Sequence, residues 1–548
     1  MQAVIMAGGK GTRLSALTKD AIPKPMVPIL GKPLLEWQVE QLRGYGITDI
    51  IMVIGHLGEK IRSHFGDGGP FGVRVRYIEE TQPLGTAGAF YYLKEMLCTG
   101  ETPATDAPAA SALPVTGMSA RSVDPPATDA PSSALPVAST STRSADRPAT
   151  DARAASASAK SAMTGAVPAG YFLLLFGDVF FDVDLQRMER FHVEKHARAT
   201  LFVHPNNHPF DSDLVRLDDD GRVTGFDSKN NNRTYWYDNC VNGGIYILDR
   251  DICDLVHEPV KTDLEKDILF PLVELGQAKT PSAYQAQPYQ ASGVRAAAGT
   301  APANPATADT APANPAAAGT ASVYGYRSPE YIKDVGTVER VGEAIRDIES
   351  GLATAKCLKN RQKCIFLDRD GTINRLNGLV YREEDFELEP CASGAIGRIN
   401  TSGYLAIVVT NQPVVARGLC TIGDVENIHR KLSTLLGKQG IYLDDVLFCP
   451  HHPDRGYPEE NPLYKIPCDC RKPATGMIEK AARRYHIDLS ASWMVGDTTM
   501  DIQTGKNAGL GTALVLTGEA GRDGKYGATP DMVCADLADA VERILAGS

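Results

Sequence analysis

The sequence has no apolar run approaching the roughly 18 residues that cross a bilayer, so no membrane-spanning segment is predicted. It also has no excess of positive charge, since 56 Lys and Arg face 67 Asp and Glu for a formal net charge of −11. Nucleic acid is therefore not an expected partner. Cysteine is scarce and odd in number, 11 in 548 residues, which fits a reducing compartment better than a disulfide framework. Met1–Gly9 has no basic segment and predicts a strand entering a glycine loop, not a signal peptide. We expect a cytoplasmic protein; the oligomeric state is left open.

Two stretches lack large apolar residues almost entirely. PATDAPAASALPV at Pro103 returns as PATDAPSSALPV at Pro126, and APANPA occurs at Ala301 and again at Ala311. Such Ala-, Pro-, Ser- and Thr-rich tracts cannot bury enough apolar surface to offset the entropy of ordering them. We predict disordered insertions at about 100–168 and 284–322. The repeated units have no hydrophobic face to stack, which excludes a repeat protein.

The remaining chain alternates strand-like and helix-like patterns, which predicts an α/β protein. We expect two α/β domains, 1–355 and 363–548, joined by a linker at 356–362. The expected strands of the first domain are Ala3–Met6, Asp49–Ile54, Val73–Ile78 and Tyr171–Phe176, with a helix at Leu34–Tyr45. Those of the second are Cys364–Leu367, Leu405–Val409, Val446–Phe448, Met494–Val495 and Thr512–Leu516.

The stretch Cys364–Thr372 places two carboxylates, Asp368 and Asp370, directly after a buried strand and before a glycine turn. Two acids this close repel each other unless a cation sits between them. The chemistry that uses such a pair is phosphoryl transfer. Asp368 would attack phosphorus, Mg²⁺ would neutralise charge, and Asp370 would pass protons to and from the leaving oxygen.

Later segments supply the partners that this chemistry needs. Thr410 and Asn411 end a strand with donors for phosphate oxygens, Lys472 can neutralise the phosphate and the nucleophile, and Asp497 ends another strand, with Asp501 following. In this order the motifs resemble the haloacid dehalogenase superfamily of phosphatases. The resemblance implies a Rossmannoid domain in which Asp368, Asp370 and Asp497 bind Mg²⁺.

Between these motifs lie two pairs of metal-type residues. Cys449 and His451 form one pair, and Cys468 and Cys470 form the other. Three thiols and an imidazole suit a closed, tetrahedral, structural Zn²⁺; buried free cysteines or a disulfide are the alternatives. A zinc ion there would pin the loop that carries Arg471 and Lys472 over the catalytic aspartates.

The motifs Cys-Pro-His-His-Pro and Cys-Asp-Cys-Arg-Lys-Pro resemble those of the heptose-1,7-bisphosphate 7-phosphatases. Histidinol-phosphate phosphatases share the zinc loop and are the alternative. The sequence departs from the pattern at Pro413–Val415, in a loop that also carries Arg417 and that we expect to face substrate. The departure leaves the catalytic residues intact and bears on the choice of sugar and anomer.

The first domain opens with a glycine-rich loop after a strand, Gly8-Gly9-Lys10-Gly11-Thr12-Arg13. Glycines let backbone N–H groups approach phosphate oxygens, and Arg13 can bind them bidentately. Lys24 lies where a second phosphate-facing cation would be useful. Asp178 ends a strand with a carboxylate suited to Mg²⁺, and Asp334 supplies a second.

These motifs, together with QPLGTAG, NGGIY, LEKD and KDVGT in this order, resemble the sugar-1-phosphate nucleotidyltransferases, which are Rossmann-like. The resemblance covers the first domain except its insertions. It implies that Asp178 and Asp334 bind Mg²⁺ and that Lys24 faces phosphate. The residues implied at the nucleoside triphosphate are Gly8, Gly9, Gly11, Thr12 and Arg13; near the base, Gln82, Gly85 and Thr86; and at the sugar phosphate, Asn242, Gly243, Glu265 and Lys266.

Guanine presents N1–H and N2–H donors that Glu79 or Glu80 could accept, and the resemblance is closest to guanylyltransferases of mannose- or heptose-type sugars. The hypothesis is a bifunctional enzyme that takes heptose 1,7-bisphosphate through heptose 1-phosphate and GTP to GDP-D-glycero-α-D-manno-heptose. Alternatives are a mannose-1-phosphate or other sugar-1-phosphate nucleotidyltransferase fused to a phosphatase of unrelated specificity, and a domain that binds a sugar nucleotide without turnover.

Overall fold

A computed structural model describes residues 1–9, 14, 18, 21–99, 170–278, 322–454, 456 and 460–547. The insertions predicted at about 100–168 and 284–322 lie almost entirely outside these residues, as do Gly11, Thr12 and Arg13. Within the described part of the chain, no helix combines the length and apolar character needed to span a bilayer.

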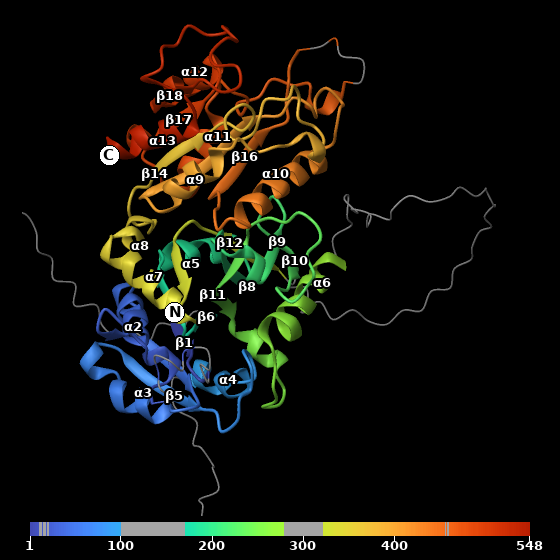
Figure 1. The fold of residues 1–548 in the computed structure, drawn as a ribbon. Coiled ribbons are helices and arrows are strands. Elements are labelled where there is room, and N and C mark those ends of the chain that lie inside the picture. Colours follow the sequence, from blue (N-terminus) through green and yellow to red (C-terminus); the bar gives the residue numbers. More distant parts are fainter. Residues whose placement is uncertain are drawn as a thin grey trace, which may run out of the picture. The chain divides into compact units, whose positions relative to one another are not determined.

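The predicted strands of the first domain form one half of a mixed sheet (Figure 1). β1 (Gln2–Met6) lies between β4 (Asp49–Ile54) and β6 (Tyr171–Phe176) and is parallel to both, and β5 (Arg74–Glu79) continues in parallel beyond β4. These apolar runs are almost fully buried, as expected for parallel strands covered on both faces. The parallel α/β arrangement predicted for this part is confirmed.

The other half of this sheet is largely antiparallel, which strand patterns alone did not predict. β11 (Val241–Asp249) pairs antiparallel with β6 and with β8 (Ala199–His204), and β12 (Val323–Arg327) runs parallel to β8. β9 (Leu214–Leu217) and β10 (Val223–Asp227) complete the edge. The pairing of β11 with β8 shifts register between Asn242 and Tyr246. Asn242 still pairs with Val203, so the irregularity begins directly after it.

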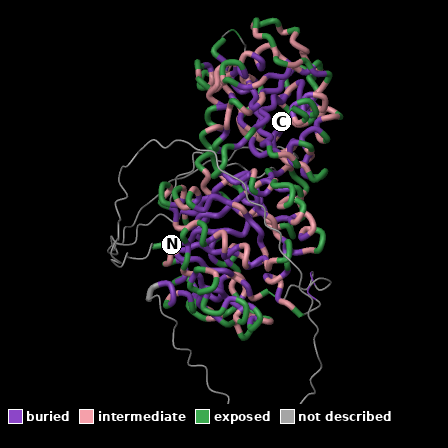
Figure 2. Tube along the Cα trace, turned by 90° about the vertical axis from the view of Figure 1, so that its left-hand side faces the viewer, coloured by how far each residue is buried: buried purple, intermediate pink, exposed green. Residues whose placement is uncertain are grey.

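Helices cover both faces of the first sheet because alternate strand residues point to opposite sides. One apolar cluster joins Val4 of β1 to α4 (Phe90–Thr99) and α6 (Phe270–Ala278). The other joins Ala3 and Ile5 to α2 (Leu34–Gly44), α3 (Gly58–Phe65) and α5 (Leu185–Glu194). The buried residues are drawn in purple in Figure 2 and concentrate in the interior, with the exposed residues in green around them.

A small two-stranded sheet brings two distant carboxylates together. β7 (Val179–Asp182) pairs antiparallel with β13 (Tyr331–Asp334), with Val179 opposite Asp334. Asp178 immediately precedes β7, so it lies beside Asp334 although more than 150 residues separate them. β2 (Pro28–Ile29), α7 (Val338–Glu349) and α8 (Leu352–Ala355) contribute to a separate apolar cluster, and β3 (Lys32–Pro33) pairs with β2.

The second domain is built on a parallel sheet of order β16-β15-β14-β17-β18-β19. The strands are β14 (Lys363–Leu367), β15 (Tyr404–Asn411), β16 (Asp445–Cys449), β17 (Trp493–Gly496), β18 (Gly511–Val515) and β19 (Met532–Cys534). α9 (Ala392–Asn400), α10 (Ile422–Gly437) and α13 (Leu537–Ala546) cover one face. α11 (Gly476–Tyr485) covers the other, and α12 (Thr499–Ala508) packs on β17 and β18. All five predicted strands are present, and their carboxyl ends meet at one edge.

The segment predicted as the linker begins with buried residues. Lys356, Cys357 and Leu358 are 3%, 2% and 2% exposed. The backbone N–H of Leu358 donates to the Glu330 carboxylate at 2.8 Å. This stretch is therefore packed and hydrogen-bonded where it leaves the first domain.

Candidate active sites

The phosphatase candidate is a buried cluster of three carboxylates around one lysine. Asp368 follows β14, Asp497 follows β17, and Asp501 lies in the first turn of α12, with carboxylate oxygens within 4.8 Å of one another. Lys472 Nζ lies 2.6 Å from Asp368 Oδ1 and 2.6 Å from Asp501 Oδ1. Gly371 closes the turn with φ +86°, and a Cβ there would lie 2.3 Å from Asp497 Oδ2. Only glycine fits that approach.

The electrostatics of this cluster favour a divalent cation. Burial, together with the neighbouring carboxylates, raises the pKa of Asp497 to about 8, and burial raises that of Asp368 to about 6. Asp497 Oδ1 is buried and has no hydrogen-bond partner within the described chain. Unsatisfied carboxylate oxygen in an acidic pocket is the donor set that Mg²⁺ prefers. The residues present therefore fit Mg²⁺.

The structure does not bring the side chain of Asp370 into this cluster. Its carboxylate instead accepts hydrogen bonds from Arg369, Asn374 and Gln412. Asp501, which follows Asp497 in the sequence and had no predicted role of its own, occupies the third carboxylate position. Its signal was the spacing from Asp497 and the preceding Thr498, because Thr498 and Asp501 form the capping box of α12.

Thr410 and Asn411 lie at the carboxyl end of β15, as predicted. The Asn411 amide pairs with the backbone of Lys472, donating to its carbonyl at 3.1 Å and accepting from its N–H at 3.0 Å. Thr410 Oγ1 accepts from Gln412 Nε2 at 3.0 Å. Asn411 thus holds the lysine loop against the sheet.

At Pro413–Val415, where the sequence departs from the 7-phosphatase pattern, two valine side chains pack beneath the loop. Val414 and Val415 are each 1% exposed and form an apolar cluster with Val425. These two side chains therefore serve packing, and the expectation that the loop as a whole faces substrate stays a prediction. Arg417 and Arg471 are half-buried, and Arg471 Nη1 donates to the His451 carbonyl at 3.2 Å.

The four predicted zinc ligands converge. Cys470 Sγ lies 3.2 Å from Cys449 Sγ, 3.3 Å from Cys468 Sγ and 3.4 Å from His451 Nδ1. These sulfurs are free cysteines, well beyond the roughly 2.05 Å of a disulfide. Four S and N donors this close suit tetrahedral Zn²⁺. The pairing Cys468–Cys470 directly precedes Arg471 and Lys472, so a metal here would anchor the catalytic lysine loop.

In the first domain, Lys24 joins the two predicted magnesium ligands. Its ammonium forms an ion pair with Asp178 and lies 3.8 Å from Asp334 Oδ1, which is buried and has no hydrogen bond to any described residue. Arg340 Nη1 donates to the other Asp334 oxygen at 3.0 Å. Sequence reasoning missed Arg340; its signal was its place in the first turns of α7, six residues after Asp334. Two acids with an unsatisfied oxygen fit Mg²⁺ as well.

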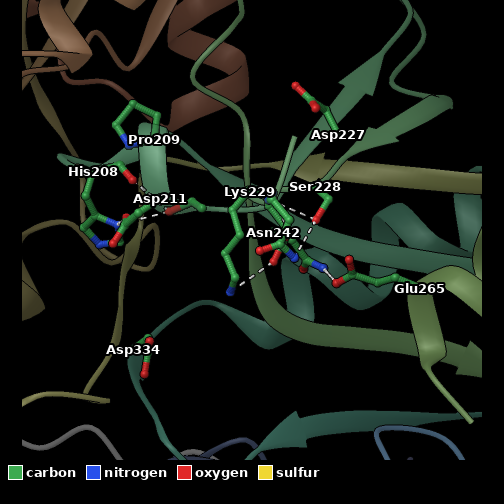
Figure 3. Close-up of polar contacts among 12 residues, drawn as sticks. His208, Pro209, Asp211, Asp227, Ser228, Lys229, Asn242, Glu265 and Asp334 are labelled. Atoms are coloured by element: carbon green, nitrogen blue, oxygen red, sulfur yellow. Dashed lines mark hydrogen bonds and ion pairs between the residues drawn. The ribbon is translucent and has the colours of Figure 1, made fainter. Parts of the chain in front are cut away.

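The predicted sugar-phosphate residues form a second group (Figure 3). Asn242 Nδ2 donates to Glu265, as Figure 3 shows. Tyr246 Oη donates to the same Glu265 oxygen at 3.1 Å. Burial, with Asp213 nearby, raises the pKa of Glu265 to about 7. Lys266 is exposed, and Gly243 could not carry a Cβ, which would lie 2.8 Å from the Phe202 ring.

The turn predicted to lie near the base is tied to that group. Gly85 has φ +80°, and a Cβ there would lie 2.5 Å from the Thr262 carbonyl oxygen. Thr86 Oγ1 accepts from the Leu264 N–H at 2.7 Å. Gln82 is exposed, whereas Glu80 reaches the glycine loop, since a Cβ on Gly8 would lie 3.0 Å from Glu80 Oε2. Gly9 is exposed beside it.

The two sites define a nucleotide-handling transferase domain and a phosphatase domain in one chain. The chain belongs to the nucleotidyl transferase family, which matches residues 2–104 and 138–351, and the HAD-hydrolase-like family matches 469–540. Its C-terminal part belongs with the D-glycero-β-D-manno-heptose-1,7-bisphosphate 7-phosphatases. It is 41% identical over 156 residues to that enzyme of Escherichia coli K12, covering 28% of this chain and 80% of that protein.

Solved structures give two further likenesses. A D,D-heptose 1,7-bisphosphate phosphatase of B. bronchiseptica, complexed with magnesium and phosphate, is 34% identical and covers 34% of this chain and 100% of its own, with a TM-score of 0.31. HddC of Yersinia pseudotuberculosis is 18% identical, covering 63% and 99%, with a TM-score of 0.37. The predicted fusion of a nucleotidyltransferase with a phosphatase is confirmed, and the protein is an enzyme acting on small molecules.

Proposed function

We propose that this enzyme removes the 7-phosphate of D-glycero-D-manno-heptose 1,7-bisphosphate and joins the resulting heptose 1-phosphate to GMP from GTP, forming GDP-D-glycero-α-D-manno-heptose. The observation that carries the proposal is the membership of one chain in both families. Relatives of the second domain are named for cleaving the 7-phosphate, which leaves a sugar 1-phosphate. The first domain resembles nucleotidyltransferases whose acceptor substrate is a sugar 1-phosphate.

The phosphatase geometry supports attack by Asp368. Its carboxylate oxygen bonds to phosphorus, the bond from phosphorus to the sugar oxygen breaks, and that oxygen takes a proton from Asp370. Water then attacks the phosphoaspartate and gives a proton to Asp370. The bond to Asp368 breaks and inorganic phosphate leaves. Lys472, 2.6 Å from Asp368, would balance negative charge in both steps.

The transferase reaction needs no covalent intermediate. An oxygen of the sugar phosphate attacks the α-phosphorus of GTP, and the bond to the departing pyrophosphate breaks. The protein's contribution is to position the reactants and to neutralise charge. Lys24 and Arg340 supply cations beside Asp178 and Asp334, and the Asn242–Glu265 pair offers polar groups for the sugar.

We assign Mg²⁺ to both carboxylate sites and structural Zn²⁺ to the cysteine–histidine cluster. Asp368 and Asp497, with Asp501 beside them, would hold the first Mg²⁺, and Asp178 with Asp334 the second. Mg²⁺ supplies charge neutralisation on phosphate oxygens when bound.

Glu80 supports guanine as the base. Its Oε1 is buried without a hydrogen-bond partner among the described residues, and its other oxygen faces Gly8. Burial raises the pKa of Glu80 to about 6, still ionised at neutral pH. Glu79, in contrast, is 56% exposed and pairs with Arg62 at 3.1 Å. The carboxylate also accepts a hydrogen bond from the Leu84 backbone, so, among the described residues, one oxygen is unpartnered and the other keeps a lone pair. It can therefore accept both the N1–H and N2–H donors of guanine.

Glu80→Gln should therefore change base preference. The amide can accept only one of guanine's two donors and presents its own NH₂ to the other, whereas it complements adenine's N6–H and N1. We expect the ratio of kcat/KM for GTP over ATP to fall about 10- to 100-fold. The measurement is pyrophosphate release with each nucleotide. Glu79→Gln is the matched control, and an unchanged ratio in Glu80→Gln would reject Glu80 as the base reader.

The function is tested by incubating the full chain with heptose 1,7-bisphosphate, GTP and Mg²⁺ and identifying the nucleotide sugar by mass. Both anomers are supplied, because the curated relatives carry the β anomer in their names. GDP-heptose and two released anions, phosphate and pyrophosphate, are expected. Heptose 1-phosphate accumulating without a GDP-sugar, or faster turnover of mannose 1-phosphate, would count against the proposal.

A further inference from the structure

Arg369 is a fully buried charge in the phosphatase domain whose role the reaction scheme leaves open. It lies between the two catalytic aspartates in sequence and is 0% exposed. Burying a guanidinium is costly unless its charge is balanced and its donors are satisfied. Its ion pair is with Asp370.

Arg369 donates several hydrogen bonds to the Asp370 carboxylate. Its Nε and Nη2 donate to Asp370 Oδ1 at 3.0 and 2.9 Å, and Nη2 also donates to Oδ2 at 2.9 Å. Gln412 Nε2 donates to Oδ2 at 2.9 Å and to Thr410 Oγ1 at 3.0 Å. Asn374 Nδ2 donates to Oδ1 at 3.1 Å. Both oxygens of Asp370 are thereby fixed relative to the phosphate-facing Thr410.

The third guanidinium nitrogen of Arg369, Nη1, contacts a histidine of α10. Arg369 Nη1 lies 3.2 Å from His429 Nε2, and His429 is 6% exposed. Burial and the adjacent Arg369 hold the pKa of His429 well below its usual range, so the imidazole is neutral and Nε2 accepts the bond. The Phe448 ring of β16 packs edge-on against His429, with ring centroids 5.2 Å apart.

We propose that Arg369, braced by His429, is the positioning residue that sets the orientation of Asp370 for proton transfer to the leaving oxygen. Arg369 acts through Asp370 and does not itself touch substrate. The contribution of Arg369 to kcat should therefore be larger for substrates whose leaving oxygen is more basic and needs a proton as it departs. The inference rests on the phosphatase half of the proposed function and is independent of the sugar that is cleaved.

The test compares leaving groups. A sugar alkoxide needs a proton as it departs, phenolate needs it less, and 4-nitrophenolate hardly at all. Arg369→Gln should lower kcat for heptose 1,7-bisphosphate on the order of 10- to 100-fold, the range in which a general acid contributes. It should leave 4-nitrophenyl phosphate turnover within a few-fold of wild type, with phenyl phosphate between them. Equal losses on all three phosphates would show a merely structural role, and a gain in kcat would show that Arg369 restrains Asp370; either overturns the proposal.

A second pair of variants keeps the test available should the loss of a buried charge unfold the domain. His429→Gln retains an acceptor for Arg369, and His429→Leu removes it. The Leu variant should show the same leaving-group pattern at smaller amplitude, and the Gln variant should recover most of the sugar phosphate activity. If the two variants had the same kcat on each of the three phosphates, the hydrogen bond between Arg369 and His429 would have no role in orienting Asp370. Arg398→Gln, a 50% exposed arginine paired with Glu542, is the control.

The identity of the substrate is tested separately by these assays. If wild type fails to cleave heptose 1,7-bisphosphate, the proposed function fails, while the comparison of phenyl with 4-nitrophenyl phosphate still decides the role of Arg369.

Discussion

Asp368→Asn should abolish phosphate release from heptose 1,7-bisphosphate while the same protein continues to release pyrophosphate from GTP and heptose 1-phosphate. The amide has no charge to attack phosphorus, and it also removes one carboxylate from the cluster that fits Mg²⁺. Among the described residues, Lys472 would then keep Asp501 alone as an ion-pair partner, at 2.6 Å. Loss of a covalent nucleophile is expected to cost on the order of 10³-fold or more in kcat.

Two assays on one purified protein decide this outcome: inorganic phosphate and pyrophosphate are followed separately. Asp385→Asn, which alters a carboxylate paired with Arg382 away from the cluster, should leave both rates unchanged. Loss of both activities in Asp368→Asn would refute independent sites. Retained phosphate release would remove Asp368 from its assigned role.

Asp178→Ala is expected to give the reciprocal result. Asp178 pairs with Lys24, and it lies beside Asp334, whose buried Oδ1 has no hydrogen-bond partner in the described part of the chain. Removing it takes away half of the carboxylate pair and releases Lys24 from its place. We expect nucleotidyl transfer to fall on the order of 10³-fold, as when charge stabilisation at a phosphoryl centre is lost, with phosphate release unchanged.

The readout is pyrophosphate release at saturating GTP over a range of Mg²⁺ concentrations. Asp254→Ala, an aspartate that is 73% exposed and 3.9 Å from Lys94, is the matched control. Partial recovery of Asp178→Ala at high Mg²⁺ would agree with a metal-binding role. Wild-type activity in this variant would instead reject the transferase site.

Much of the fold could be predicted because short, continuous apolar segments indicate strands that are buried on both faces. β4 and β6 begin and end at the predicted residues, and β14 and β15 differ by a few residues at their ends. The antiparallel half of the first sheet was not predicted, because strand direction depends on which distant segment pairs with it. The register shift between Asn242 and Tyr246 belongs to this half, and no local sequence pattern reports it.

The candidate sites divide in the same way. DRDGT, the two Cys pairs and the Lys24 segment are local motifs whose residue types already limit the chemistry. The Arg369–His429 pair could not be found so, since it joins residues of two elements 60 positions apart in sequence. Arg340 lies only six residues after Asp334 and was missed because no motif marks it. Gln412 was adjacent to a predicted residue and was missed because its role depends on Asp370 pointing toward it.

The sequence by itself determined the two chemistries, because metal-type carboxylates, cations and glycine turns occur in it at spacings that serve phosphoryl transfer and little else. Only the tertiary structure decided which acids share a site. It placed Asp501 with Asp368 and turned Asp370 toward Arg369, and it set Glu80 apart from Glu79. The physical reason is that a carboxylate's role depends on its neighbours and its burial, and both are properties of the packed chain.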